Sequence, residues 1–232
     1  DINYVSAYWN EEMGYYADHV TGVIESGTRN LKPQYIRKGD WSEWYGIIAR
    51  ANVILHFADQ IEATKERKDY YRGQAYFYKA LAYFGIVRKW GDCVIINDEV
   101  DLEPRAKSPW TEVIGYAIGL AREAVNLLPE YDKVRDSRGN APKYKDEPCK
   151  GAANALLAHL CAWKAGGKYY AQPNQRDYDE KELWEEAEKA CTAIIGNENG
   201  PATGIYRLAS NSEEVCTTVL RGNSTESIFE GE

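Results

Sequence analysis

Residues 73–92, with the sequence GQAYFYKALAYFGIVRKWGD, decide the fold class of this protein. Apolar and small side chains recur at intervals of three and four residues, which predicts a helix over residues 70–89. The aromatic side chains at positions 76, 83 and 90 lie on a neighbouring face of the same helix. A helix that is apolar around most of its circumference packs on several sides. We therefore expect this helix to lie at the centre of its domain, and Gly91-Asp92 to turn the chain after it.

The same periodicity predicts four further helices, over residues 41–62, 109–128, 149–165 and 180–196. Ser108 is expected to be the N-cap of the third helix in chain order, with Pro109 at its first position. Gly166-Gly167 is expected to end the helix 149–165, and Asp179 is expected to mark the start of the helix 180–196. The helices 41–62 and 70–89 form one antiparallel pair, and 149–165 and 180–196 form another. The sequence thus predicts an all-α fold with tetratricopeptide-like antiparallel helix pairs and long irregular loops.

The first part of the chain differs from the rest. Residues 1–40 are rich in aromatic residues, contain glycine and show weak periodicity. We divide the chain into a loop-rich aromatic segment, 1–40, and a helical domain, 41–232. Two further loops are expected, at 91–107, which holds a short β-branched run, and at 130–148, where Asp136 to Asn140 has the composition of a turn.

Composition excludes several classes of protein. The chain has 232 residues, a net charge of −8 and 44% hydrophobic residues, which is ordinary for a folded domain. An acidic chain lacks the basic surface of a nucleic-acid-binding protein, so no nucleic acid partner is expected. No apolar run is long enough to span a bilayer. The five cysteines form no metal-binding motif, and Cys161 and Cys191 are expected to be small buried side chains on helices.

No arrangement typical of catalysis is recognisable. The three histidines are isolated in sequence, and no nucleotide-binding, serine hydrolase or zinc protease motif occurs. Glu11, Glu12 and Asp18 could supply a pair of carboxylates like that of a glycosidase, but their separation decides that chemistry. The acidic residues of 98–103 match no EF-hand spacing, and we interpret them as a solvated turn. We expect no catalytic residue, metal or cofactor.

The aromatic residues are the unusual feature of the composition. The chain holds 18 Tyr and 7 Trp but only 4 Phe. Tyr and Trp combine a flat apolar face with a polar edge, which suits stacking on sugar rings. Six of them lie within residues 1–40, where no Phe occurs. They either stack on a ligand or pack the loop onto the helices, and both interpretations remain open at this point.

Five segments resemble the SusD/RagB family of outer-membrane nutrient-binding lipoproteins. Residues 73–84, followed by Val87-Arg88-Lys89-Trp90-Gly91-Asp92, resemble the family's signature helix and its W/F-G-D-V-P end, with Val94 in place of the usual proline. The other four segments are the spacing Trp41, Tyr45, Ile48, Ala51-Asn52, the stretch Lys150 to Ala158, the pair Trp184 and Ala187 with Ile205 to Leu208, and the stretch Glu226 to Glu230. Family members are considerably longer, so the resemblance covers their N-terminal, tetratricopeptide-bearing part.

This resemblance implies non-catalytic binding of an oligosaccharide or polysaccharide at the cell surface. It implies delivery of the glycan to a SusC-like TonB-dependent transporter of the outer membrane, with the protein held there by a lipid anchor on a cysteine before Asp1. A tetratricopeptide-type peptide-binding scaffold is the first alternative. An all-helical glycosidase is the second.

In the family, the loop before the first of these helices contributes to the ligand surface. We therefore predict a binding site in residues 1–42, with Trp9 and Trp41 stacking on sugar rings and Arg37 and Asp40 bonding hydroxyl groups. The predicted ligand-binding residues are Trp9, Tyr15, Tyr16, Tyr35, Arg37, Asp40 and Trp41. If these residues do not carry binding, the sequence points next to Lys168-Tyr169-Tyr170 or to a C-terminal part that this chain lacks.

Overall fold

The computed structural model describes residues 41–97, 104–197 and 203–230. Within these ranges the chain forms helices and loops and no extended strand, and an isolated antiparallel bridge joins Cys93 and Ser108. The predicted all-α fold is confirmed. Six of the seven predicted binding residues fall in 1–40 and lie outside the described ranges.

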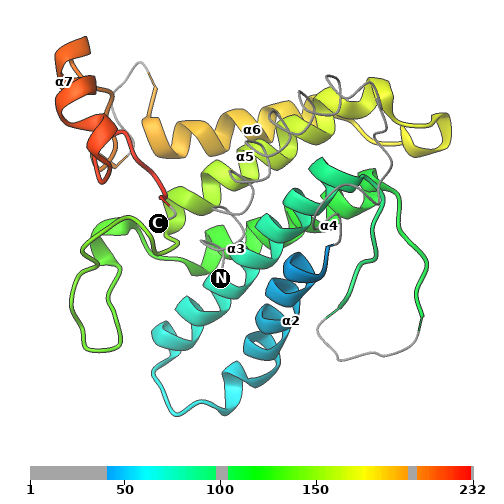
Figure 1. Cartoon of the computed structure of the whole chain (residues 1–232), viewed down its shortest axis with the longest axis horizontal. Helices are drawn as coiled ribbons and strands as arrows, with labels where there is room; N and C mark the ends of the chain where they lie inside the picture. Colours follow the sequence, from blue (N-terminus) through cyan, green and yellow to red (C-terminus); the bar gives the residue numbers. More distant parts are fainter. Residues whose placement is uncertain (1–40, 98–103, 198–202, 231–232) are drawn as a thin grey trace, which may run out of the picture.

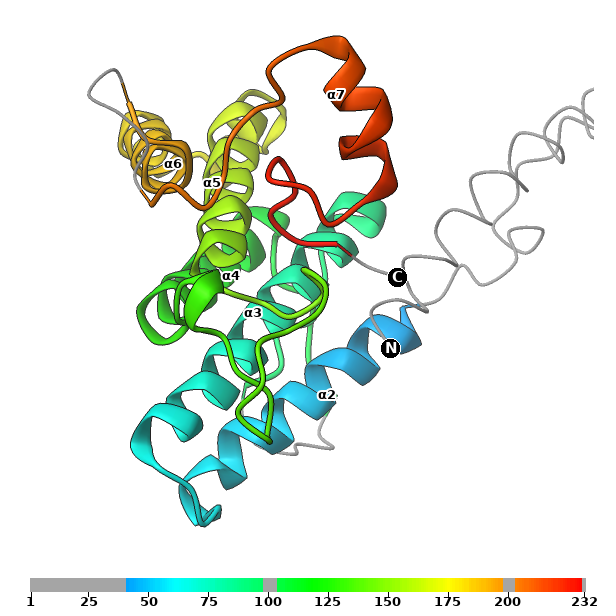
Figure 2. The same ribbon diagram turned by 90° about the vertical axis from the view of Figure 1, so that its left-hand side faces the viewer.

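The helices form a series of antiparallel neighbours. From α2 to α6, each packs mainly against the next in sequence, so that both predicted pairs are present (Figures 1 and 2). No described helix is long and apolar enough to cross a membrane. The helices are α2 (Ser42–Phe57), α3 (Lys65–Trp90), α4 (Trp110–Leu127), α5 (Lys150–Gly167), α6 (Glu180–Ile195) and α7 (Ser212–Thr217).

Helix α3 lies at the centre of the fold, as its sequence predicts. It has 26 residues and packs against α2 on one side and α4 on another. The side chain of Thr64 caps its start by accepting a hydrogen bond from the Arg67 N–H at 3.3 Å. It ends at Gly91, which has a positive φ of 76° that favours glycine. Its fully buried side chains include those of Ala80 and Tyr83.

Small residues let the helices approach closely. A Cβ atom added to Gly73 would lie 2.8 Å from Cγ of Leu128, just after α4. Ala117, Ala121 and Ala124 are fully buried on α4 itself. Because a larger side chain at these positions would push the helices apart, glycine and alanine set the spacing between α3 and α4.

The β-branched run at 93–96 forms no strand. Side chains from the helices satisfy its backbone instead. The Tyr45 hydroxyl donates to the Val94 carbonyl at 2.7 Å and accepts from the Val94 N–H at 2.9 Å. The Tyr83 hydroxyl accepts from the Ile96 N–H at 2.8 Å. Burial raises the pKa of both phenols, so both stay protonated and fix this loop to α2 and α3.

The predicted start of α4 is wrong by one residue. Pro109 is the N-cap and the helix begins at Trp110. Ser108 is not the cap because the backbone of Pro109 is still extended, with φ −55° and ψ 144°, so Trp110 is the first helical residue. Asp92 takes the place of Ser108 from across the loop, since its Oδ1 accepts a hydrogen bond from the Trp110 N–H at 2.9 Å. A carboxylate at a helix start also interacts favourably with the helix dipole.

The prediction that Cys191 is buried is also wrong. Trp163 and Trp184 are 43% and 51% exposed, and Cys191 is exposed, although all three fit apolar stripes in the sequence. Cys161 is buried, as predicted. The reason is that α6, which holds Trp184 and Cys191, packs mainly against α5 and leaves its other faces to solvent.

A buried lysine fastens the C-terminal segment, residues 203–230, to the loop before α5. The Lys145 ammonium donates to the carbonyls of Ser224 and Ser227, both at 2.6 Å. It also lies 5.4 Å and 5.1 Å from the ring centroids of Tyr131 and Tyr206. Burial lowers the pKa of Lys145, while the carbonyls and aromatic faces stabilise its charge.

We expect Gly73→Ala to destabilise the protein by about 1–3 kcal/mol, because the new methyl group overlaps Leu128. Gly119→Ala on α4 is the matched control, since a Cβ atom there meets nothing within 4 Å. It should stabilise the helix by roughly 0.5–1 kcal/mol. Urea unfolding of both variants measures the effect. Equal stabilities would show that α3 and α4 are not in close contact at Gly73.

Candidate functional site

Aromatic side chains gather at one end of the helix series. The antiparallel order places the start of α2, the end of α3, the start of α4 and the end of α5 together, towards the right of Figure 1. We call this region the aromatic end. Its members are Trp41, Trp90, Trp110, Tyr169 and Tyr170.

Trp41 is the predicted site residue that the described ranges include. Its ring meets Tyr45 edge-to-face, with the centroids 5.7 Å apart, and lies 6.3 Å from the ring of Trp90. The Lys107 ammonium lies 4.8 Å from its centroid. Trp41 is therefore half-buried in a packed group, where part of its ring surface is already in contact with protein.

Tyr169 and Tyr170 present their rings to solvent. They belong to a single 3₁₀ turn, η4 (Lys168–Tyr170), directly after α5. Their side chains are 78% and 82% exposed. The two rings are nearly perpendicular, at 87°, with centroids 5.4 Å apart. Two large aromatic side chains this exposed and adjacent are unusual unless they contact a ligand or partner.

The backbone that carries these tyrosines is held in place. Arg176 donates from Nε to the Ala171 carbonyl at 2.7 Å and from Nη2 to the Tyr169 carbonyl at 2.9 Å. The Lys168 ammonium donates to the carbonyl of Tyr178 at 2.7 Å. The loop after α5 is thus closed on itself by side-chain bonds, and its exposed rings start from a fixed backbone.

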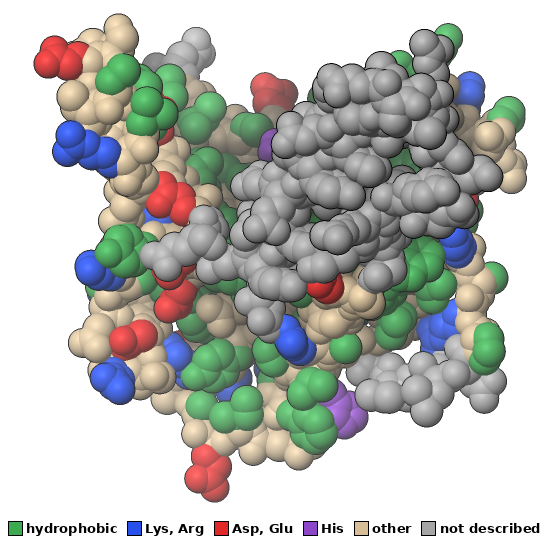
Figure 3. All heavy atoms as spheres, viewed as in Figure 1, with side chains coloured by type: hydrophobic (Ala, Val, Ile, Leu, Met, Phe, Trp, Pro, Cys, Tyr) green, Lys and Arg blue, Asp and Glu red, His purple; other side chains and the backbone are tan. Residues whose placement is uncertain are grey.

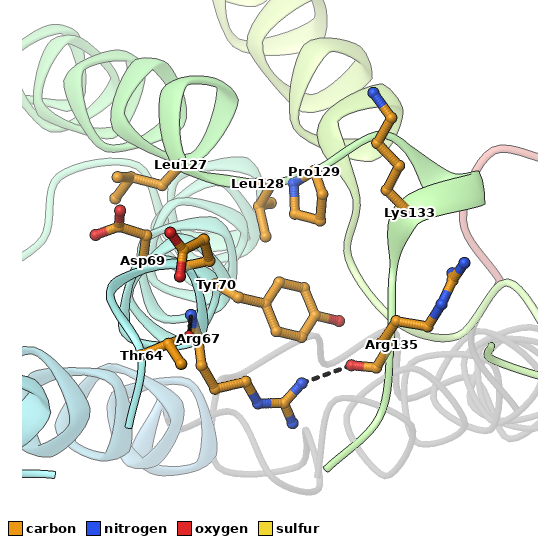
Figure 4. Close-up of a pocket in the computed structure, with 10 residues that line it drawn as sticks. Thr64, Arg67, Asp69, Tyr70, Leu127, Leu128, Pro129, Lys133 and Arg135 are labelled. Carbon is orange, nitrogen blue, oxygen red and sulfur yellow. Dashed lines mark hydrogen bonds between the residues drawn. The ribbon is translucent and has the colours of Figure 1, made fainter. Parts of the chain in front are cut away.

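A cavity of about 420 Å³ lies at the opposite ends of α3 and α4 (Figure 4). The Tyr70 hydroxyl, which points into it, donates to Glu147 at 2.5 Å, and the Arg67 guanidinium donates to the Arg135 carbonyl at 2.6 Å. The side chains of Lys133 and Arg135 point away from Tyr70. Because its central polar groups already bond to protein, this cavity is a weaker candidate for a ligand site.

An apolar patch lies over the end of α2 and the turn after it. Its exposed members are Val53, Ile54, Phe57 and Ile61, and hydrophobic side chains gather there at the bottom of Figure 3. Such a patch offers no hydrogen-bonding groups of its own for a hydroxylated ligand. The described ranges also contain no group of three metal-ligating side chains.

Tyr169 and Tyr170 are only the second candidate site in the sequence analysis. The signal that favours them is their position directly after a Gly-Gly helix end and before the amide-rich stretch 172–176. Their exposure depends on how the chain folds after α5, which residue types alone do not reveal.

The antiparallel helix pairs and the aromatic end together define a class of protein. It is a scaffold of paired helices that displays aromatic side chains at one end. Residues 4–161 match the model of a family described as SusD-like, "Starch-binding associating with outer membrane". This match covers more than half of the chain, and the protein therefore belongs to the SusD-like family.

Individual relatives agree with this assignment. The chain is 28% identical over 110 residues to SusD-like protein P2 of Formosa agariphila, a match covering 45% of this chain and 22% of the relative. It is 25% identical over 165 residues to a SusD-like protein of Bacteroides ovatus, covering 68% of this chain and 27% of the relative. A solved laminarin-binding SusD-like protein aligns with a TM-score of 0.63 and 20% identity, over 83% of this chain and 37% of that one. The chain thus spans about a quarter of the length of these curated relatives.

We expect Gly167→Ala to disturb the aromatic end, because a Cβ atom there would lie 2.6 Å from Cη2 of Trp110. The predicted loss of stability is about 1–3 kcal/mol, with faster hydrogen exchange in the η4 turn. The neighbouring Gly166→Ala is the control, since its Cβ atom would make an ordinary contact of 3.9 Å with Trp184. Urea unfolding and hydrogen-exchange mass spectrometry compare the two. If both variants behave alike, Trp110 does not rest on Gly167.

Proposed function

We propose that this protein binds glycans at the cell surface and passes them to a SusC-like TonB-dependent transporter. The observation that carries the proposal is the family match over residues 4–161. The laminarin-binding neighbour adds support, because it has the same fold and its name states a glycan ligand. The aromatic end supplies the kind of side chain that stacks on sugar rings.

The proposed binding surface combines the aromatic end with residues of the segment 1–40. Trp41 begins the described chain at this end, so the residues just before it in sequence are close to it along the backbone. The proposed contributors from that segment are Trp9, Tyr15, Tyr16, Tyr35, Arg37 and Asp40. Tyr and Trp rings would stack on pyranose faces, while the arginine and aspartate would bond hydroxyl groups.

The proposed location is the outer face of the outer membrane. The family description, which names association with the outer membrane, supports this location. A lipid on a cysteine upstream of Asp1 would hold the protein there. The proposed activity is binding without bond cleavage, because capture and delivery require that the glycan stay intact.

A glycan array combined with an assay for released reducing sugar tests the proposal. The full chain should bind one or more glycans and release no sugar from them. Sugar release would instead favour a glycosidase. Absence of binding to every glycan, together with binding to an extended peptide library, would favour a peptide-binding scaffold.

Within this proposal, Trp41→Ala should weaken binding of the best glycan from the array by roughly tenfold to a hundredfold, by analogy with stacking platforms for bases. Calorimetric titration measures the affinity. Phe57→Ala is the control, because Phe57 is an exposed aromatic residue at the opposite end of the same helix.

A thermal melt checks that both variants are folded. Unchanged affinity in a folded Trp41→Ala variant would remove Trp41 from the proposed surface.

A further inference from the structure

We propose that Tyr169 and Tyr170 form a sugar-stacking subsite that selects neutral rather than acidic glycans. This inference rests on the proposed glycan-binding function and deepens it. It needs no residue of the segment 1–40, because every side chain that builds the subsite lies in the described range 104–197.

The geometry of the two rings suits a sugar chain. Both side chains are about four-fifths exposed, so their faces are open to a ligand. Their nearly perpendicular planes direct two stacking faces along different directions. The C–H face of a pyranose packs on such an aromatic face, while the phenol hydroxyl at the ring edge can bond a sugar hydroxyl.

Side-chain hydrogen bonds order the backbone of the loop that carries these rings. Arg176 bonds the carbonyls of Tyr169 and Ala171, and Lys168 bonds that of Tyr178. The Tyr178 hydroxyl in turn donates to the carbonyl of Lys164, which ties the loop to α5. Since the backbone is already ordered before binding, a ligand pays less conformational entropy.

Neutral amides follow the tyrosines on the same loop. Gln172 and Asn174 are exposed on the same loop and follow Tyr170 closely in sequence. A planar amide is both donor and acceptor, which matches the hydroxyl groups of an uncharged sugar.

The charges of the loop argue against an acidic glycan. Residues 168–180 contain two cationic side chains, Lys168 and Arg176, and three carboxylates, Asp177, Asp179 and Glu180. Lys168 is paired with Glu180 at 3.1 Å, and Arg176 is bonded to carbonyls. Lys181, the next residue, brings the charges into balance and is itself paired with Glu185 at 3.6 Å. Because the loop has no net positive charge and its cations are engaged, it offers no attraction to a uronic acid or sulfate group.

The test uses the full chain and a defined panel of glycans. The neutral members are laminarin, xyloglucan oligosaccharides, starch and galactomannan, and the acidic members are polygalacturonate and alginate. The variants are the double change Tyr169→Ala with Tyr170→Ala, and the conservative pair Tyr169→Phe with Tyr170→Phe. Tyr144→Ala is the control, because Tyr144 is a 40% exposed tyrosine in the loop before α5, away from the aromatic end.

We expect the parent to bind a neutral glycan and not the acidic ones. The alanine pair should weaken this binding at least about tenfold. The phenylalanine pair should stay within about threefold of the parent, because it keeps the rings. Since both tyrosines are exposed, the melting temperatures should match that of the parent.

Each other result has a distinct meaning. If the parent binds a neutral glycan and the alanine pair binds it equally well, the subsite is wrong while the proposed function stands. If the parent binds only the acidic glycans, the inferred selectivity is wrong. If the parent binds no glycan at all, the proposed function fails and the subsite fails with it.

Discussion

The close contact between α3 and α4 is the constraint on which the rest of the structure depends. Glycine at position 73 and a row of alanines on α4 let the two backbones approach. Helix α2 then packs on α3, and α5 packs on α4. This order brings the end of α3, the start of α4 and the end of α5 together, and with them the loops that carry the aromatic end.

Side chains from the helices also determine how those loops run. Tyr45 and Tyr83 hold residues 94–96, and Asn52 donates to the carbonyl of Asn97 at 2.6 Å. On the other side of the aromatic end, Arg176 and Lys168 close the loop after α5. Binding loops in a helical scaffold need such bonds, because they lack the regular backbone pairing that orders a sheet. The two loops are therefore parts of the scaffold as much as the helices are.

The aromatic end contains two kinds of aromatic residue with different consequences for ligands. Trp41 is packed against protein on several sides, while Tyr169 and Tyr170 are open to solvent on a fixed backbone. A packed ring such as that of Trp41 leaves mainly its edge for a ligand, whereas an exposed ring such as that of Tyr169 leaves a whole face. Membership of the SusD-like family supports the proposal of a glycan ligand. The difference in exposure indicates that Tyr169 and Tyr170 are the described residues best placed to stack on such a ligand.

The sequence by itself determined the all-α class, the helix pairs, the central place of α3 and the family, because apolar periodicity and helix-ending residues are local signals. It misplaced the start of α4, where Asp92 bonds the first helical N–H from across a loop, and it expected Cys191 to be buried, although this side chain is exposed. It could only rank Lys168-Tyr169-Tyr170 second as a site. Tertiary structure decided the start of α4 and the exposure of these side chains, because capping from a distance and exposure both depend on which segments meet in space. A stripe of apolar residues shows that a helix has a packing face, but only the neighbouring helices determine how much of that face is covered.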